Sequence, residues 1–304
     1  MTSPLYTAED VIINGVSFNR IDEDGNYWII EDIDGWWGLP EPTVPDDTRP
    51  FQDDGSYFAV GRYEARQITV SGHIMPGPGD TGAANPAQSA ALNAARARNL
   101  LNRALNIVRS TAIFQVNEYD QAKIAAVQLV ARPLTKFNDI RNVLEFNFQL
   151  RAPDPRKYAV DETIVDTSLQ TEAAGYTFPM TFDYTFGAHG TAGLVSIVNS
   201  GSYDTYGVLT VRGPIIHPSI EHVEMGRTVS IDMSLSADEF LEINLKTKTI
   251  LLNGTESRRN KLDAGSEWFF FQPGESTLRF TGYQITPGPE TANLAIMLRS
   301  AWIE

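Results

Sequence analysis

Histidines, the side chains best suited to metal binding or proton transfer near neutral pH, are few and scattered in this sequence. They are His73, His189, His217 and His222, and no two have the i, i+4 spacing that places two imidazoles on one face of a helix. The chain contains no cysteine, which excludes disulfides, thiolate zinc sites and cysteine nucleophiles. The sequence therefore predicts no metal site.

A second candidate for ion binding is the acidic stretch Asp22-Glu23-Asp24-Gly25-Asn26, which resembles the start of a calcium loop. An EF-hand loop needs glycine at its sixth position and glutamate at its twelfth, where this chain has Tyr27 and Ile33. We therefore expect a solvated hairpin turn here, without a calcium ion.

Catalytic motifs are equally scarce. The sequence has no GxSxG nucleophile elbow and no glycine-rich loop that would cradle a phosphate. We expect no catalytic residues, no cofactor and no enzymatic activity. A glycosidase stays as a third alternative, because it needs only two carboxylates, whose pairing across strands a sequence does not reveal.

The composition bounds the class of protein. A hydrophobic content of 42% and a charged content of 20% are typical of a folded globular chain. The formal net charge of −14 opposes nucleic-acid binding, which calls for a basic surface. No apolar run approaches the roughly 18 residues of a membrane-spanning helix, and the first residues lack the pattern of a signal peptide. We expect synthesis in a cytoplasm, no membrane insertion and no recognition of a nucleic-acid sequence.

The charge is unevenly distributed along the first half of the chain. Residues 1–60 contain thirteen acidic residues against two arginines, whereas Arg96, Arg98, Arg103 and Arg109 form a basic group further on. Such polarity could orient neighbouring copies of the protein electrostatically. A solvated acidic surface that keeps the chain soluble explains the same pattern.

Apolar and polar residues alternate with a period of two along most of the segments that would position a functional site. Short strands punctuated by turn signals, such as Asn14-Gly15, predict a mainly β protein. One long helix is expected after Asn85-Pro86. Its apolar stripe is Ala90, Ala94, Ala97, Leu101, Ala104, Leu105 and Val108. Residues 1–155 are therefore expected to form an N-terminal β-sandwich or split-barrel-like domain with one long α-helix.

A polar, proline-containing stretch, RAPDPRKYAVDE, predicts a domain edge near residue 155. Beyond it, short strands with frequent turns favour a C-terminal β-sandwich, or jelly roll, over residues 156–304.

A proline-rich segment from Gly35 to Gly55 carries the residues we expect to contact a partner. These are Trp36, Trp37, Leu39 and Pro40. A loop of this length is usually functional, and tryptophan is enriched among the residues that dominate binding at interfaces. In the alternative, the segment folds back over its own domain.

From Leu241 to Phe280 the sequence has two alternating strands joined by Lys246-Thr247-Lys248, an Asn253-Gly254 turn, a Trp268-Phe269 step and a Pro273-Gly274 step. This stretch resembles the C-terminal half of the distal tail protein family (Dit-like minor tail proteins) of long-tailed siphophages. The N-terminal half follows the same family in the order of its features. These are the early NG hairpin, the WWGLPEP segment, the RxITVSGHI-type strand, the alanine- and leucine-rich helix and the FNFQLRAPDPRKY-type exit strand.

The resemblance implies a structural virion protein at the distal end of the tail. It implies a C-terminal domain of the galectin-like type and a hexameric ring of copies joined edge to edge. The implied partners are the tail tube protein and the tail-tip hub or tail-associated lysin, with the tape measure protein and receptor-binding proteins as further candidates. The alternative function is a carbohydrate-binding adsorption module that contacts the host cell wall.

Overall fold

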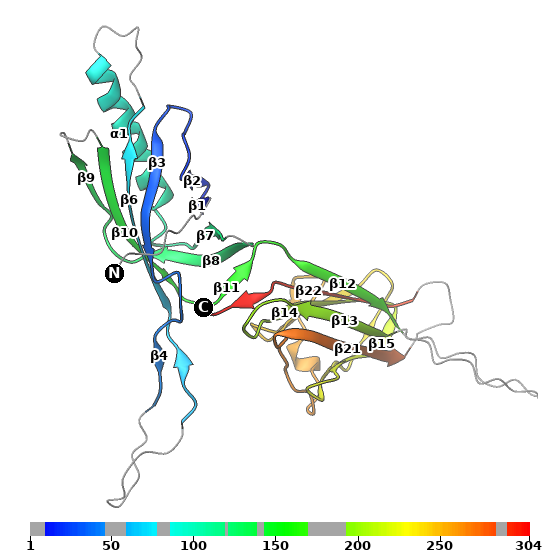
Figure 1. The fold of residues 1–304 in the computed structure, drawn as a ribbon. Coiled ribbons are helices and arrows are strands. Elements are labelled where there is room, and N and C mark those ends of the chain that lie inside the picture. The colour runs from blue at the N-terminus through cyan, green and yellow to red at the C-terminus, as the bar shows by residue number, and fades with distance from the viewer. Residues whose placement is uncertain are drawn as a thin grey trace, which may run out of the picture. The chain divides into compact units, whose positions relative to one another are not determined.

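The computed structural model describes residues 10–45, 59–77, 86–118, 121–138, 143–169, 193–283 and 291–304. The chain divides into two compact units (Figure 1). Unit 1 comprises residues 1–160 together with 302–304, and unit 2 comprises residues 161–301. The boundary expected from the sequence lay at residue 155, and the return of the last three residues to unit 1 was not expected. His189 and Asn85 lie outside the described residues.

Over its described residues, unit 1 combines strands β1 to β11 with one helix, and the last strand, β23, pairs with β11. The elements are β1 (Val11–Ile13), β2 (Val16–Phe18), β3 (Tyr27–Asp34), β4 (Pro42–Thr43), β5 (Arg62–Tyr63), β6 (Arg66–Met75), α1 (Pro86–Ala104), β7 (Ala112–Asn117), β8 (Ala122–Leu129), β9 (Leu134–Asn138), β10 (Val143–Ala152), β11 (Lys157–Ala159) and β23 (Ala301–Trp302).

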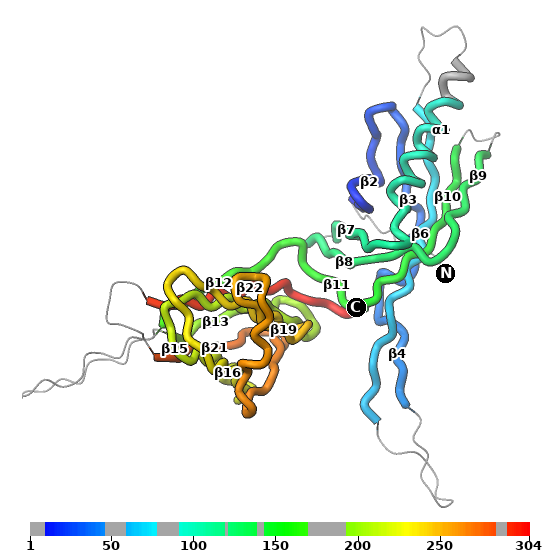
Figure 2. The backbone as a smooth tube through the Cα atoms, turned by 180° about the vertical axis from the view of Figure 1, so that it is seen from behind, coloured from blue at the N-terminus to red at the C-terminus, as the bar shows by residue number. Residues whose placement is uncertain are grey.

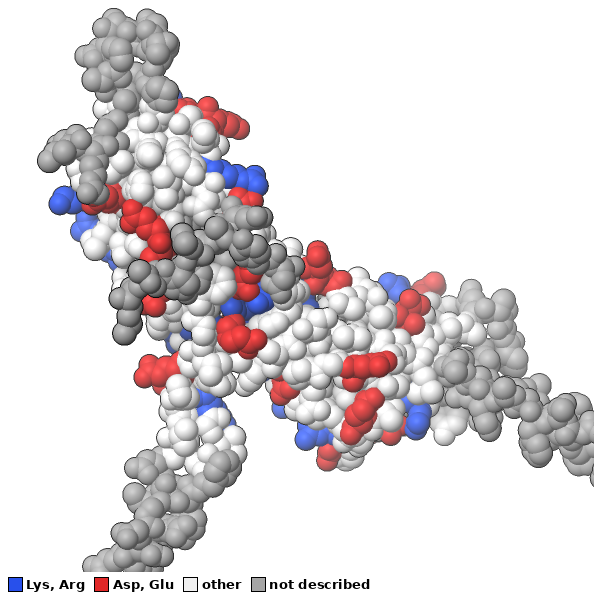
Figure 3. Space-filling view, in the orientation of Figure 1, with Lys and Arg blue, Asp and Glu red and all other residues white. Residues whose placement is uncertain are grey.

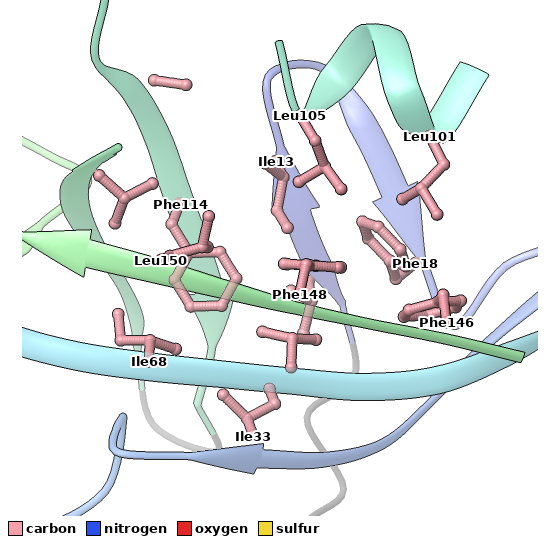
Figure 4. Packing of buried hydrophobic residues seen from close by; sticks show 14 of the residues in the cluster. Ile13, Phe18, Ile33, Ile68, Leu101, Leu105, Phe114, Phe146, Phe148 and Leu150 are labelled. Atoms are coloured by element: carbon pink, nitrogen blue, oxygen red, sulfur yellow. The ribbon is translucent and has the colours of Figure 1, made fainter. Parts of the chain in front are cut away.

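The main sheet of unit 1 has the order β2-β1-β7-β8-β10-β6-β3, with β9 paired to β10 and β11 paired to β8. Strand β10 pairs with β6 from Leu144 to Ala152, but with β8 only at Leu150 and Arg151. The sheet can therefore bend at this point, and its two halves face each other across one core, as in a split barrel. The core includes Ile13, Phe18 and Phe114 from one half and Ile68, Phe146 and Phe148 from the other (Figure 4).

Helix α1 closes this core and contacts β2, β6 and β10. Ala94, Ala97, Leu101, Ala104 and Leu105 are all buried, so the predicted stripe is confirmed at these positions. Val108 is wrong as a stripe residue, because its side chain is 64% exposed. The helix ends at Ala104, and Ile107 turns into the core in place of Val108.

The predicted hairpin turns are present where asparagine and glycine adopt positive φ. The angles are 47° and 81° at Asn14 and Gly15, and 51° and 71° at Asn253 and Gly254. These two residue types adopt the left-handed conformation at low cost, which is why the dipeptide specifies a tight turn locally.

The described part of unit 2 is built from strands and one short 3-10 helix. Its elements are β12 (Thr163–Ser168), β13 (Leu194–Asn199), β14 (Gly207–Arg212), β15 (Ile215–His222), β16 (Arg227–Ser230), β17 (Ser234–Leu235), β18 (Phe240–Asn244), β19 (Thr249–Leu252), β20 (Glu256–Ser257), η1 (Arg259–Lys261), β21 (Gly274–Tyr283) and β22 (Asn293–Leu298).

Two sheets pack face to face in unit 2. One has the order β12-β22-β14-β18-β19-β20, and the other has the order β13-β21-β15-β16 with β17 paired to β15. Alternate residues of β14, β18 and β22 on one sheet and of β15 and β21 on the other form a single apolar core. The expectation of a mainly β protein with β-sandwich domains is confirmed. Among the described residues, no helix is long and apolar enough to cross a membrane.

Candidate assembly surfaces

The structure places Trp36 inside unit 1. Its side chain is fully buried, and its ring meets that of Phe114 edge to face, with 5.1 Å between centroids. Its Nε1 atom donates a hydrogen bond to Oε1 of Glu118 at 3.0 Å. Trp36 is therefore a core residue and does not present its ring to a partner.

Two further residues of the WWGLPEP segment also fold back over unit 1. Trp37 packs against the core and Pro40 is buried. Gly35, with a φ of +79°, lies so close to β6 that a Cβ atom there would be 1.9 Å from the carbonyl oxygen of Gln67. Only glycine permits this approach. Leu39, 62% exposed, is the one member of the predicted contact set whose side chain points to solvent.

A buried cluster of charged side chains anchors this segment. The carboxylate of Glu118 accepts hydrogen bonds from Nζ of Lys123 and, at 3.2 Å, from Nζ of Lys157. The Lys157 side chain is 1% exposed, and its Nζ atom lies 4.9 Å from the centroid of the Trp36 ring. Burial lowers the pKa of Lys157 to about 8, although the charge of Glu118 opposes the shift.

Arg66, at the start of β6, joins the same region to the end of the chain. Its buried guanidinium donates to the carbonyl oxygens of Gly35, Trp36 and Gly38 at 2.9–3.0 Å. It also donates to Ile303 and, at 3.1 Å, to Pro155. Burial lowers the pKa of Arg66. One side chain therefore holds three segments that are far apart in sequence.

The returning chain end completes unit 1. Trp302 and Ile303 are buried, and Nζ of Lys123 lies 5.0 Å from the centroid of the Trp302 ring, a cation–π contact. The sequence did not predict the cluster of Glu118, Lys123, Lys157 and Arg66, because each of these charged residues, taken without its partners, is expected to be exposed to solvent.

The two edges of the sheet in unit 1 carry different charges. At one edge, β3 pairs only with β6 among the described strands and bears Glu31, Asp32 and Asp34. At the other edge, β9 pairs only with β10 in the same part of the chain and bears Lys136. An unpaired strand edge offers backbone N–H and C=O groups to another strand. On β3 the N–H groups of Trp28 and Ile30 already donate to Arg20 and Asn19, so only the second half of this edge is open in this way.

A groove of about 560 Å³ crosses the face of this sheet that points away from the core. It is lined by Leu134 and Lys136 of β9, Glu145 of β10, and His73 and Glu31 of β6 and β3. Nδ1 of His73 lies 2.7 Å from Oε1 of Glu31. His73 thus occupies a polar sheet face, and none of the described residues form a group that could hold a metal ion.

The two described histidines of unit 2 lie apart from each other. His217 pairs with Asp263 at 2.9 Å near the surface. His222 is buried against the rings of Phe269 and Phe271, at centroid distances of 5.5 and 5.9 Å. Burial lowers the pKa of His222, which favours the neutral imidazole.

The acidic turn near the start of the chain is held by its own hydrogen bonds. The carboxylate of Asp22 accepts from the backbone N–H groups of Asp24 and Asn26 and from Nε1 of Trp28, at 2.8–3.0 Å. These donors occupy both oxygens, which favours the expected hairpin turn. Figure 3 shows acidic and basic side chains interspersed on the face in view, with no continuous basic surface over the described residues.

Two comparisons with known proteins support a conclusion about the fold and the family resemblance of this chain. Residues 200–287 match the model of the siphovirus-type tail component family, C-terminal domain. The structure of SPP1 Dit, described as a paradigm of the hub adsorption apparatus in phages that infect Gram-positive bacteria, covers 95% of this chain and 97% of its own. Its TM-score is 0.62 at 10% sequence identity, which establishes a shared fold.

Two structures of the activated phage p2 baseplate, with calcium and with strontium, also align. They cover 85% and 95% of this chain and 89% and 96% of their own, with 10% and 9% identity. Their TM-scores of 0.37 and 0.42 are too low to support an argument. No curated protein sequence matches the chain. The resemblance to the distal tail proteins is confirmed: residues 200–287 match the model of the siphovirus-type tail component family, and the chain as a whole has a Dit-like fold.

Proposed function

We propose that this protein is a structural component of the distal end of a siphophage tail, where six copies form a ring. The ring would connect the tail tube to the tail-tip hub and the host-adsorption apparatus. The observation that carries the proposal is the family match over residues 200–287 within a chain of Dit-like fold. The protein would be made in the host cytoplasm and carried in the virion.

The sheet of unit 1 offers a physical basis for the ring. Its acidic β3 edge and its β9 edge, which bears Lys136, lie on opposite sides of the same sheet. A contact that joins one edge of a copy to the other edge of the next is heterologous, and such contacts close into rings when the rotation per copy allows it. Opposite charges at the two edges favour this order over like edges meeting.

The ribbon of β4 and β5 supplies a further contact surface for the tail tube protein, the hub or the tail-associated lysin. Leu39, Val44 and Val60 on and beside this ribbon are 62%, 61% and 77% exposed. A two-stranded ribbon is marginally stable alone in water, so burial of these side chains against a neighbour would stabilise it. Of the four residues expected to contact a partner, we propose Leu39 for this role, because its side chain is exposed. The tape measure protein and receptor-binding proteins remain candidate partners.

Two measurements test this function. Antibodies against the protein should label the tail tip of intact virions in electron micrographs, and the purified protein should have six times the mass of one chain. Label on the head, or on no part of the virion, would overturn the structural role. A protein that stays monomeric at every concentration, alone and with the tail tube protein, would overturn the ring.

The alternative, contact with host cell-wall carbohydrate, has one observation in its favour. Trp268 and Phe270 are only half-buried, and Phe270 meets Tyr206 edge to face, with 6.4 Å between the ring centroids. The Arg227 guanidinium lies 6.0 Å from the Phe270 ring centroid. Saturable binding of cell-wall polysaccharide by the full chain, lost in Phe270→Ala, would support this reading. Equal binding by both proteins would exclude this site.

A further inference from the structure

The imidazole of His222 is a buried titratable group at the end of β15 in unit 2. Figure 2 shows β15 together with β16 and β21, and strand pairing places β15 between these two. The His222 side chain is 2% exposed and packs against two rings of the aromatic segment, residues 269–271. Its Nε2 atom is buried and has no hydrogen-bond partner among the described residues. A buried polar atom without a partner is rare in folded proteins and calls for an explanation.

The other ring nitrogen faces the turn of residues 223–226, which joins β15 to β16. Nδ1 lies 3.2 Å from Oε2 of Glu224 and 3.4 Å from the backbone nitrogen of Met225. With a proton, Nδ1 donates to the carboxylate, and without one it accepts from the Met225 N–H group. Either tautomer of the neutral imidazole therefore has a partner at Nδ1, and only Nε2 is left without one.

The same turn is tied to β21 through two backbone groups of Thr277. The carboxylate of Glu224 accepts from the Thr277 N–H group, at 2.9 and 3.0 Å from its two oxygens. The N–H group of Val223 donates to the Thr277 carbonyl oxygen at 3.0 Å. The imidazole therefore lies between a turn held by β21 on one side and the aromatic segment on the other.

Proton uptake by His222 creates a charge that these surroundings compensate at one nitrogen only. An imidazolium carries N–H groups on both nitrogens. Glu224 can accept from Nδ1–H, but Nε2–H stays buried without an acceptor, which is costly. Arg227, which pairs with His222 on β16, adds a second cation, and Glu267 lies 3.7 Å from it. Leu278, the residue of β21 opposite His222, does not titrate.

We propose that His222 is an acid-sensitive latch of unit 2. When the imidazole takes up a proton, the turn of residues 223–226 and the aromatic segment separate, so that water reaches Nε2. The latch concerns unit 2 alone and holds with or without the ring. Phe270 belongs to the same segment and is half-buried, so acid changes the surface to which its ring contributes.

Acid favours the opened form because its imidazole is hydrated. In the closed form, burial lowers the pKa of His222 below its usual value of 6.5, while Glu224 raises it and Arg227 lowers it by smaller amounts. Between these two pKa values the opened form binds more protons than the closed form. The population of the opened form should therefore rise as the pH falls through about 6.5. One proton is involved, so the rise is at most about tenfold per pH unit.

Hydrogen exchange of the full chain tests the latch, because it reports local opening. Peptides covering residues 222–228 and 267–273 are compared at about pH 7.5 and about pH 5, after correction for the intrinsic pH dependence of exchange. Both peptides should lose protection together by several-fold at the lower pH. Strands β18 and β19, on the opposite sheet, should exchange equally at both pH values.

Variants assign the effect to His222. His222→Phe fills the site with a ring that does not titrate, and His222→Gln keeps a donor for Glu224 without titrating. Whichever of the two folds should show equal protection of both peptides at the two pH values. His217→Asn is the matched control, because His217 is 39% exposed and has a φ of 54°, which asparagine tolerates. It should keep the natural response. Equal protection of the natural chain at both pH values, or an acid response that survives in the His222 variants, would overturn the latch.

Discussion

Lys157 and Glu118 form an ion pair at 3.2 Å in which the lysine side chain is 1% exposed and the glutamate side chain 9%. The carboxylate also accepts a hydrogen bond from Trp36 and contacts Lys123. The single negative charge of Glu118 is therefore shared by two buried lysines, Lys123 and Lys157, and it does not fully neutralise the charge of Lys157. Removing one partner of such a buried pair is far more damaging than replacing the whole pair by apolar groups.

The first prediction concerns the pH dependence of stability. Burial lowers the pKa of Lys157 from 10.5 to about 8 in the folded protein, so the unfolded chain binds more protons between these values. The contribution of Lys157 to the free energy of unfolding should therefore rise from about pH 8 to about pH 10.5. It is lost again as the pH falls from about 10.5 to about 8, and it is absent below about pH 8.

Lys157→Met isolates this contribution, because methionine fills much of the same volume without a titrating group. The measurement is denaturant unfolding of both proteins at several pH values from 7 to 10.5. The difference in unfolding free energy between the natural protein and the variant should shift in favour of the natural protein with rising pH. A constant difference across this range would contradict the assignment.

The second prediction separates the two halves of the WWGLPEP segment. Trp36→Ala should destabilise unit 1 by roughly 3–5 kcal/mol, the usual cost of truncating a buried aromatic residue. Leu39→Ala should change stability by less than about 0.5 kcal/mol, because its side chain is exposed. Thermal and denaturant unfolding measure both. If the Trp36 variant kept its full stability and only failed to assemble, the tryptophan would be a contact residue after all.

The third prediction concerns the chain end. Trp302→Ala should destabilise unit 1 by roughly 3–5 kcal/mol, although the substitution lies far from the rest of unit 1 in sequence. Hydrogen exchange should show faster exchange in β6, β8 and β11, with β14 and β18 of unit 2 unchanged. Ile164→Ala, on an exposed strand face of unit 2, is the matched control. Faster exchange confined to unit 2 would place the chain end with that unit.

The fourth prediction tests the faces of α1. Leu101 is fully buried, so Leu101→Ala should cost roughly 2–5 kcal/mol of unfolding free energy. Arg103 is exposed two positions away, and Arg103→Ala should have little effect. Equal losses for both variants in urea unfolding would mean that the helix packs differently.

Features set by neighbouring residues could be predicted from the sequence. The Asn14-Gly15 turn depends only on the backbone conformations that these two residues favour. The buried stripe of α1 and the alternation along β10 follow from the periods of helix and strand. The mainly β class, the single long helix, the sandwich of unit 2 and the family resemblance all rest on such local patterns.

Only the tertiary structure decided where Trp36 lies and where the chain ends. Trp36 donates to Glu118, 82 residues away, and Arg66 binds Ile303, 237 residues away. The alternation of apolar and polar residues, which indicates the buried positions of a strand, stops in a proline-rich segment. The sequence therefore did not predict whether Trp36 is buried. A charged side chain is expected to be exposed to solvent unless its partners are known. Burying the charge is costly, and only polar or charged groups from distant segments offset that cost. Phe137 of β9, Leu144 of β10, Ile74 of β6 and Trp28 of β3 likewise lie in one row only because the register of the four strands pairs them.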